Sequence, residues 1–88
     1  MTVRFITYKT PTPGTYEQGV YVYLYEHGGN DGKTMEEINK VFWYARLESE
    51  VKFENVVQNL LNEGWIGVNK RRGATRYRAY KRQHRKKE

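Results

Sequence analysis

A change in hydrophobic period at Gly64 constrains the fold of this 88-residue chain more than any other feature. The apolar residues just before it recur at intervals of three and four: Phe53, Val56, Val57, Leu60 and Leu61. That spacing predicts a helix over about 49–63 with one buried face, ended by the glycine. Residues 65–70 and 75–80 instead alternate, and 71–74 between them contain a glycine, so the sequence predicts a β-hairpin directly after the helix.

Capping signals predict another helix near the start of the chain. Thr15 and Gln18 fit a capping box, in which the Thr15 hydroxyl accepts from the Gln18 backbone and the Gln18 side chain reaches back to Thr15. A helix is therefore expected from 15 to about 27, with Gly28-Gly29 as its stop. Residues 20–25 also alternate and have strand-favouring side chains, so a strand competes there; the cap and the glycine stop favour the helix.

A second capping box begins at Thr34 and is completed by Glu37, so a short helix is expected over about 34–42. Residues 43–47 are then expected to form the connection to the helix at 49–63. Before the first helix, residues 1–14 contain both prolines of the chain, which favours an arm or a short strand there.

Composition narrows the class of protein. The chain has no cysteine, which excludes a disulfide framework and a thiolate metal site. Its two histidines, His27 and His84, lack metal-ligand spacing, and no nucleophile–base set, phosphate loop or dinucleotide motif is present. We therefore expect no catalysis, no cofactor and no metal. No apolar stretch approaches a membrane span or a signal peptide, so an intracellular protein without a membrane partner is expected.

Charge is distributed unevenly along the chain, whose net charge is +6. Residues 1–69 carry six basic and nine acidic residues, whereas residues 70–88 carry ten basic residues and one acidic residue. A mildly acidic body with a strongly basic C-terminal segment indicates a polyanionic partner. Residues 81–88 have no apolar side chain to anchor them, which predicts a disordered basic tail.

Three stretches resemble the winged helix-turn-helix family. Residues 24–29 (LYEHGG) are similar to the end of its first helix, 33–38 (KTMEEI) to the opening of its second, and 56–66 (VVQNLLNEGWI) to its recognition helix running into the first wing strand. With the hairpin they cover about residues 15–80. The resemblance implies an α+β fold of three helices followed by a two-stranded antiparallel wing. It also implies a protein that binds double-stranded DNA, such as a transcriptional regulator, with the third helix in the major groove.

The predicted site residues follow from that arrangement. Polar side chains opposite the apolar face of the third helix are expected at base edges: Ser49, Lys52, Asn55 and Asn59. Cations of the hairpin are expected on the DNA backbone or in the minor groove: Lys70, Arg71, Arg72, Arg76 and Arg78. Cations of the tail are expected to extend the backbone contact: Lys81, Arg82, Arg85, Lys86 and Lys87.

The third helix leaves alternatives open because it carries more acidic than basic residues, and carboxylates are repelled by phosphates. A second hypothesis is an adaptor in a transcription or replication assembly that docks on a protein through this acidic helix. A third is RNA binding through Tyr77 and Tyr80, which would then be exposed, whereas the DNA hypothesis places Tyr77 in the core. We also expect a homodimer formed through residues 2–8 or through the first helix.

Overall fold

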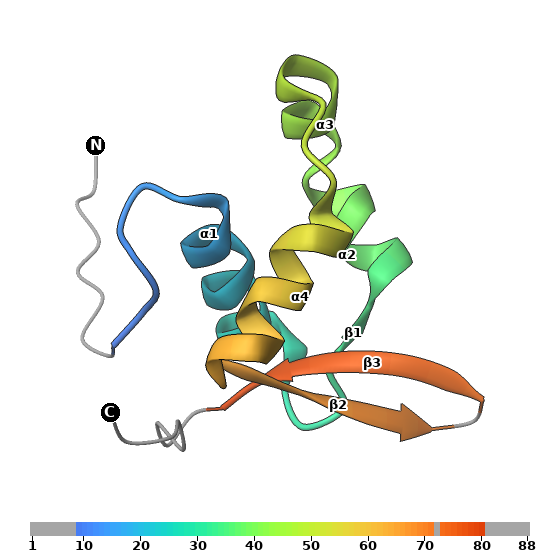
Figure 1. Cartoon of the computed structure of the whole chain (residues 1–88). Coiled ribbons are helices and arrows are strands. Elements are labelled where there is room, and N and C mark those ends of the chain that lie inside the picture. Colours follow the sequence, from blue (N-terminus) through green and yellow to red (C-terminus); the bar gives the residue numbers. More distant parts are fainter. Residues whose placement is uncertain (1–8, 72, 81–88) are drawn as a thin grey trace.

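The computed structural model describes residues 9–71 and 73–80; the predicted N-terminal arm (most of 1–14) and the basic tail (81–88) lie largely or wholly outside these ranges. The described residues form a mixed α+β fold in which helices pack on one side of a small antiparallel sheet (Figure 1). The elements in chain order are α1 (Tyr16–Tyr23), η1 (Leu24–Gly28), β1 (Lys33–Thr34), α2 (Met35–Val41), α3 (Trp43–Ser49), α4 (Phe53–Glu63), β2 (Ile66–Arg71) and β3 (Ala74–Ala79).

The first helix forms where the capping signal predicts it. The Thr15 hydroxyl accepts from the backbone of Gln18 at 3.2 Å, but the Gln18 side chain reaches back to the Gly14 N–H, at 3.0 Å, and not to Thr15 as expected. α1 continues into the π-helical turn η1, and Gly29 ends it with φ of 60°. The helix prediction for this segment is confirmed, and the competing strand prediction is wrong because the cap fixes the helical start.

The second capping box is confirmed in full. Thr34 precedes α2, and its hydroxyl accepts from the Glu37 backbone at 3.2 Å. The Glu37 carboxylate accepts from the Thr34 N–H at 2.8 Å, so two backbone donors that lack helical partners are satisfied at once.

The expected connection at 43–47 and the expected start of the next helix at 49 are both wrong. Residues 43–49 form a separate helix, α3, and α4 begins only at Phe53. The chain breaks between them at Glu50, whose φ of 53° lies in the left-handed region, and Lys52 then has the extended backbone of an N-cap. Helical spacing upstream of Phe53 did not reveal this break, because a left-handed residue other than glycine has no clear sequence signal.

The predicted hairpin is confirmed, and a third strand joins it. β2 and β3 pair in register from Ile66 opposite Ala79 to Arg71 opposite Ala74. The two-residue β1 pairs with the other edge of β3, giving the order β1-β3-β2. A strand of two residues is too short to produce an alternating pattern, so the sequence did not predict β1.

The core lies between α1, α4 and the inner face of the sheet. The predicted apolar face of α4 is buried, with Leu61 at its half-buried edge. The Phe53 ring stacks on Phe42 at 5.0 Å, and the Tyr21 hydroxyl donates to the Tyr80 carbonyl at 2.9 Å. Ala79 is buried and Tyr77 packs against the core, as the alternation in this strand predicts. Within residues 9–71 and 73–80 no helix has the length and apolar character to cross a membrane.

Candidate nucleic-acid interface

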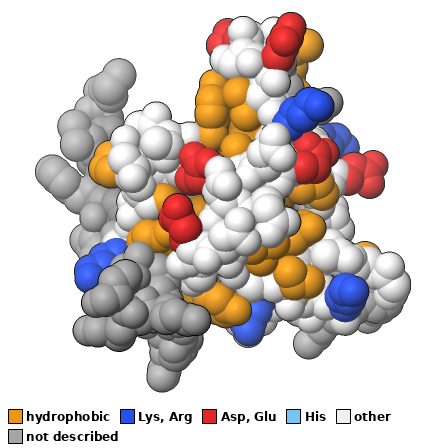
Figure 2. Space-filling model, in the orientation of Figure 1, with side chains coloured by type: hydrophobic (Ala, Val, Ile, Leu, Met, Phe, Trp, Pro, Cys, Tyr) orange, Lys and Arg blue, Asp and Glu red, His pale blue; other side chains and the backbone are white. Residues whose placement is uncertain are grey.

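The outward face of α4 consists of amide side chains. Asn55, Gln58 and Asn62 are exposed and lie opposite the buried face at spacings of three and four residues. The Gln58 amide donates to the Asn62 side-chain oxygen at 3.1 Å, which holds these two side chains along the helix. In Figure 2 this face is the white strip that runs along α4 between acidic side chains. Such a strip offers both donors and acceptors without carrying charge.

The structure brings together two of the four residues expected at base edges. Lys52 and Asn55 are exposed and adjacent at the start of α4, where the Asn55 N–H donates to the Lys52 carbonyl at 2.9 Å. Asn55 has no side-chain hydrogen bond with any described residue, so its amide is available to a ligand.

The other two residues have partners within the fold. Ser49 ends α3 and its hydroxyl accepts from the Tyr16 hydroxyl at 3.1 Å. Asn59 donates to the Glu17 carboxylate of α1 at 3.0 Å. Sequence reasoning missed Gln58, although its spacing of three residues from Asn55 on the polar face was the signal that could have found it.

Cations without an ion-pair partner among the described residues lie on the sheet. Lys70 is exposed near the end of β2, and Arg78 is half-buried on β3, opposite Gly67. Lys33 of β1 is half-buried and lies opposite Tyr77. Because side chains alternate along a strand, Lys33 and Lys70 share one face of the sheet and Arg78 lies on the other. Positive charge is therefore presented on both sides of the hairpin.

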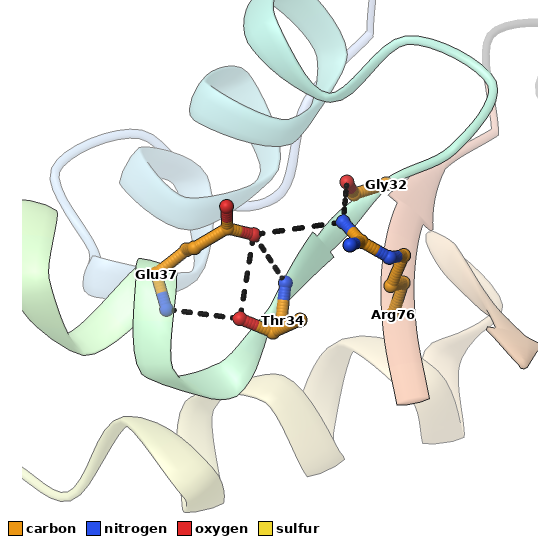
Figure 3. Close-up of polar contacts among 4 residues, drawn as sticks. All are labelled: Gly32, Thr34, Glu37 and Arg76. Atoms are coloured by element: carbon orange, nitrogen blue, oxygen red, sulfur yellow. Dashed lines mark hydrogen bonds and ion pairs between the residues drawn. The ribbon is translucent and has the colours of Figure 1, made fainter. Parts of the chain in front are cut away.

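Arg76 shares the face of Arg78, as predicted, but it has partners in the fold. Its guanidinium lies 3.8 Å from the Glu37 carboxylate and donates to the Gly32 carbonyl at 3.4 Å (Figure 3). Arg76 thus ties β3 to the N-terminus of α2. Its predicted contact with the DNA backbone stays a prediction, and such a contact would have to compete with this pair.

Glu37 is the centre of that cluster. The hydrogen bond from the Thr34 backbone lowers the pKa of the Glu37 carboxyl, and the nearby Lys33 and Arg76 lower it further, while burial opposes them. Burial and then the negative charge of Glu37 raise the pKa of the Tyr23 hydroxyl. At neutral pH the cluster therefore contains an ionised carboxylate that holds α2, β1 and β3 together.

Several predicted contacts fall outside what the structure describes. Arg71 ends β2, and its side chain is not among those described. Arg72 lies outside the described residues, as do the five tail cations: Lys81, Arg82, Arg85, Lys86 and Lys87.

Acidic side chains border the amide strip of α4. Glu54 is exposed and accepts from the Asn39 side chain of α2 at 3.4 Å, and Glu17 accepts from Asn59 on the other side. The helix and the hairpin therefore differ in electrostatic character: the helix face is uncharged with an acidic border, whereas the hairpin is basic. Across the described ranges, no three His, Cys, Asp or Glu side chains gather closely enough to bind a metal ion.

Comparison of the chain with family models, with curated proteins and with solved structures found no match.

Proposed function

We propose that this chain is a non-catalytic, double-stranded-DNA-binding protein of the winged helix-turn-helix type that acts as a transcriptional regulator. In this proposal α4 enters the major groove and the β2–β3 hairpin, the wing, lies on phosphates or in the minor groove. The observation that carries it is the direct succession of the two surfaces. A helix with an uncharged amide face ends at Gly64 and continues at once into a hairpin whose Lys70 and Arg78 have no ion-pair partner among the described residues.

The order of elements supports the fold part of the proposal. α1, α2 and α4 followed by β2 and β3 reproduce the three helices and the wing that the resemblance implies. One departure is clear: a helix-turn-helix motif joins its helices by three or four residues, whereas here α3 and its flanking residues separate α2 from α4. The extra helix changes what stands next to the start of α4, which is the end expected at base edges.

The exposed side chains of α4 suit base recognition. Asparagine and glutamine amides can pair bidentately with adenine, and lysine can donate to guanine, so Asn55, Gln58 and Lys52 form a chemically suitable set. The 11 residues of α4 make a rod of about 16 Å, which spans a major groove about 12 Å wide.

The hairpin suits phosphate binding. Lys70 and Arg78 lack ion-pair partners among the described residues, and arginine donates to phosphate through a planar fork. The acidic border of α4 weakens the attraction of DNA phosphates to the helix. The hairpin would therefore supply most of the affinity, and α4 most of the discrimination between base sequences.

The test is a salt titration of binding to mixed-sequence duplex DNA. If about five phosphates are neutralised, the slope of log K against log salt is roughly −4 to −5. The double substitution Lys70→Ala/Arg78→Ala is expected to make the slope shallower by about 2, because two phosphate contacts are lost. Lys9→Ala/Lys40→Ala removes the same charge from exposed positions outside the hairpin and α4, and is the matched control.

Two results would contradict the proposal: no duplex binding at low salt, or equal changes in slope for the two double variants. Equal changes would mean that net charge alone, and not the hairpin, attracts the polyanion.

Base readout is tested separately. A preferred duplex is first selected from a random pool, and its affinity is compared with that of a scrambled duplex. Asn55→Ala/Gln58→Ala is expected to reduce this preference about tenfold or more while leaving the salt slope unchanged. Lys9→Ala/Lys40→Ala, a double variant at exposed positions outside the hairpin and α4, is the control that should keep the preference.

The partial burial of Tyr77 weighs against RNA binding by base stacking on the hairpin. Tyr77 is half-buried and packs against the core, whereas stacking on an unpaired base would require its ring to be exposed. Tighter binding of single-stranded RNA than of duplex DNA in the same titration would reverse this preference.

A further inference from the structure

The helix α3 projects from the body of the protein (Figure 1) and exposes its large apolar side chains. Trp43 is 58% exposed, Tyr44 51% and Leu47 74%. Among the α3 side chains that the structure describes, only Ala45 is buried. A helix of seven residues has little stability of its own in water, and an apolar patch of this kind marks an interaction surface.

A hollow lies directly beside the exposed side chains. Trp43 and Leu47 line it together with residues 50–52 and Glu54 of α4, and its volume is about 690 Å³. In Figure 2 hydrophobic side chains are visible where α3 meets the body of the protein. The exposed side chains of α3 and the hollow beside them can complement each other in two copies of the chain. A two-fold axis can place an exposed side chain of each copy in the hollow of the other.

The charges at the rim of the hollow also fit a second copy. Lys52 lies between Glu50 and Glu54 in the chain, and all three line the hollow. Across a two-fold axis, Lys52 of each copy can face a glutamate of the other in the dimer without DNA; its proposed contact with a base would require this pair to open. A partner with charge of a single sign would instead bring like charges together, on the lysine or on the glutamates. We infer that the α3 face is a self-association surface, on which two copies of this chain dock α3 against α3.

The size of the surface predicts a weak dimer. Large aromatic side chains bury roughly 150–250 Å² each, so the exposed parts of Trp43 and Tyr44 together with Leu47 offer roughly 300–400 Å² per copy. This is about half of the roughly 800 Å² per partner that a standard stable interface buries. Interfaces of this small size belong to the weak, transient class, so a dissociation constant on the order of tens of micromolar is expected.

The test is sedimentation of the full chain without DNA, over protein concentrations from about 5 to about 500 µM, which span the expected constant. The average mass should rise from monomer to dimer across this range. Leu47→Glu and, independently, Trp43→Ala should each weaken association at least tenfold. Val68→Glu is the matched control: Val68 is exposed and apolar but lies on β2, outside the hollow, so this variant should associate like the unmodified chain.

Folding of each variant is checked by circular dichroism and by its thermal midpoint, which should match those of the unmodified chain because the replaced side chains are exposed. A monomer throughout the concentration range would overturn the inference. So would a dimer that is unaffected by both α3 variants, which would place the interface elsewhere, for example on α1 or residues 2–8. Because no DNA is present, neither outcome depends on whether the chain binds DNA.

Discussion

The neighbouring helices α3 and α4 use their apolar residues in opposite ways. α4 places Phe53, Val56, Val57 and Leu60 in the core and turns its amides to solvent. α3 buries Ala45 among its described side chains and leaves Trp43, Tyr44 and Leu47 exposed. The apolar content of a helix therefore does not decide whether it belongs to the core. The position of the helix relative to the rest of the described chain does, and for α3 that position leaves its large apolar side chains exposed.

The contrast originates at the link between the two helices. Glu50 has a left-handed backbone conformation, so α4 starts in a new direction and does not continue α3. The end of α3 is still held, because Ser49 accepts from Tyr16 of α1. α3 is thus held at its C-terminal end and at the buried Ala45, while its large apolar side chains are exposed.

The largest expected effect tests the burial contrast directly. Phe53→Ala should lower the free energy of unfolding by about 3–5 kcal/mol, since it leaves a cavity beneath Phe42 and Tyr16, whereas Leu47→Ala should change it by no more than about 0.5 kcal/mol. Denaturant unfolding at low micromolar protein concentration measures both. A loss above 2 kcal/mol for Leu47→Ala, on the scale of a buried leucine, would mean that α3 belongs to the core.

A smaller effect is expected at Glu50 and Gly64, the residues with left-handed backbone conformation that follow α3 and α4. Gly64 ends α4 with φ of 82°, and Gly64→Ala should lower the free energy of unfolding by about 1 kcal/mol because a Cβ is strained in that conformation. Glu50→Gly should raise it by about 0.5 kcal/mol, since glycine relieves the same strain after α3. Thermal midpoints of the two variants should shift in opposite directions; a loss of stability in Glu50→Gly would contradict the proposed origin of the contrast.

The smallest effect concerns the capped helix α2, whose Asn39 bonds to Glu54 of α4. The pKa of Glu37 is lower in the folded chain than the ordinary carboxyl pKa, so the ionised carboxylate stabilises the fold. This stabilisation is fully present above the ordinary pKa and is lost as the pH falls through the lowered pKa. Glu37→Gln should therefore reduce the free energy of unfolding more at pH 7 than at pH 3. The difference should be small because the side chain is 43% exposed and well solvated. Glu36→Gln controls for the change in net charge, and an equal pH dependence in both variants would exclude the Glu37 cluster as its source.

Local sequence signals were sufficient for most of the secondary structure. Thr15, Thr34 and Gly64 start or end their helices through hydrogen bonds to residues a few positions away. The change from helical to alternating spacing located the β2–β3 hairpin for the same reason. Such signals are readable because both partners lie in one short window of the chain.

Local signals of this kind did not predict which of the expected site residues are free to contact DNA. Ser49 bonds to a residue 33 positions away, Asn59 to one 42 positions away, and Arg76 of β3 pairs with Glu37 of α2. From the sequence all three were expected on the DNA, and the structure gives each an intramolecular partner. Asn55 and Lys70 stay available for the proposed contact because the fold places no described partner beside them.

The amino-acid sequence by itself determined the helix caps, the hairpin, the buried face of α4 and the concentration of positive charge after residue 69, because each depends on spacing or composition over a few residues. Only the tertiary structure decided that the chain breaks at Glu50, that β1 joins the sheet, that Arg76 is paired and that α3 projects with its aromatic side chains uncovered. Those outcomes depend on which distant segments meet in space, and that is set by packing the whole chain around one core.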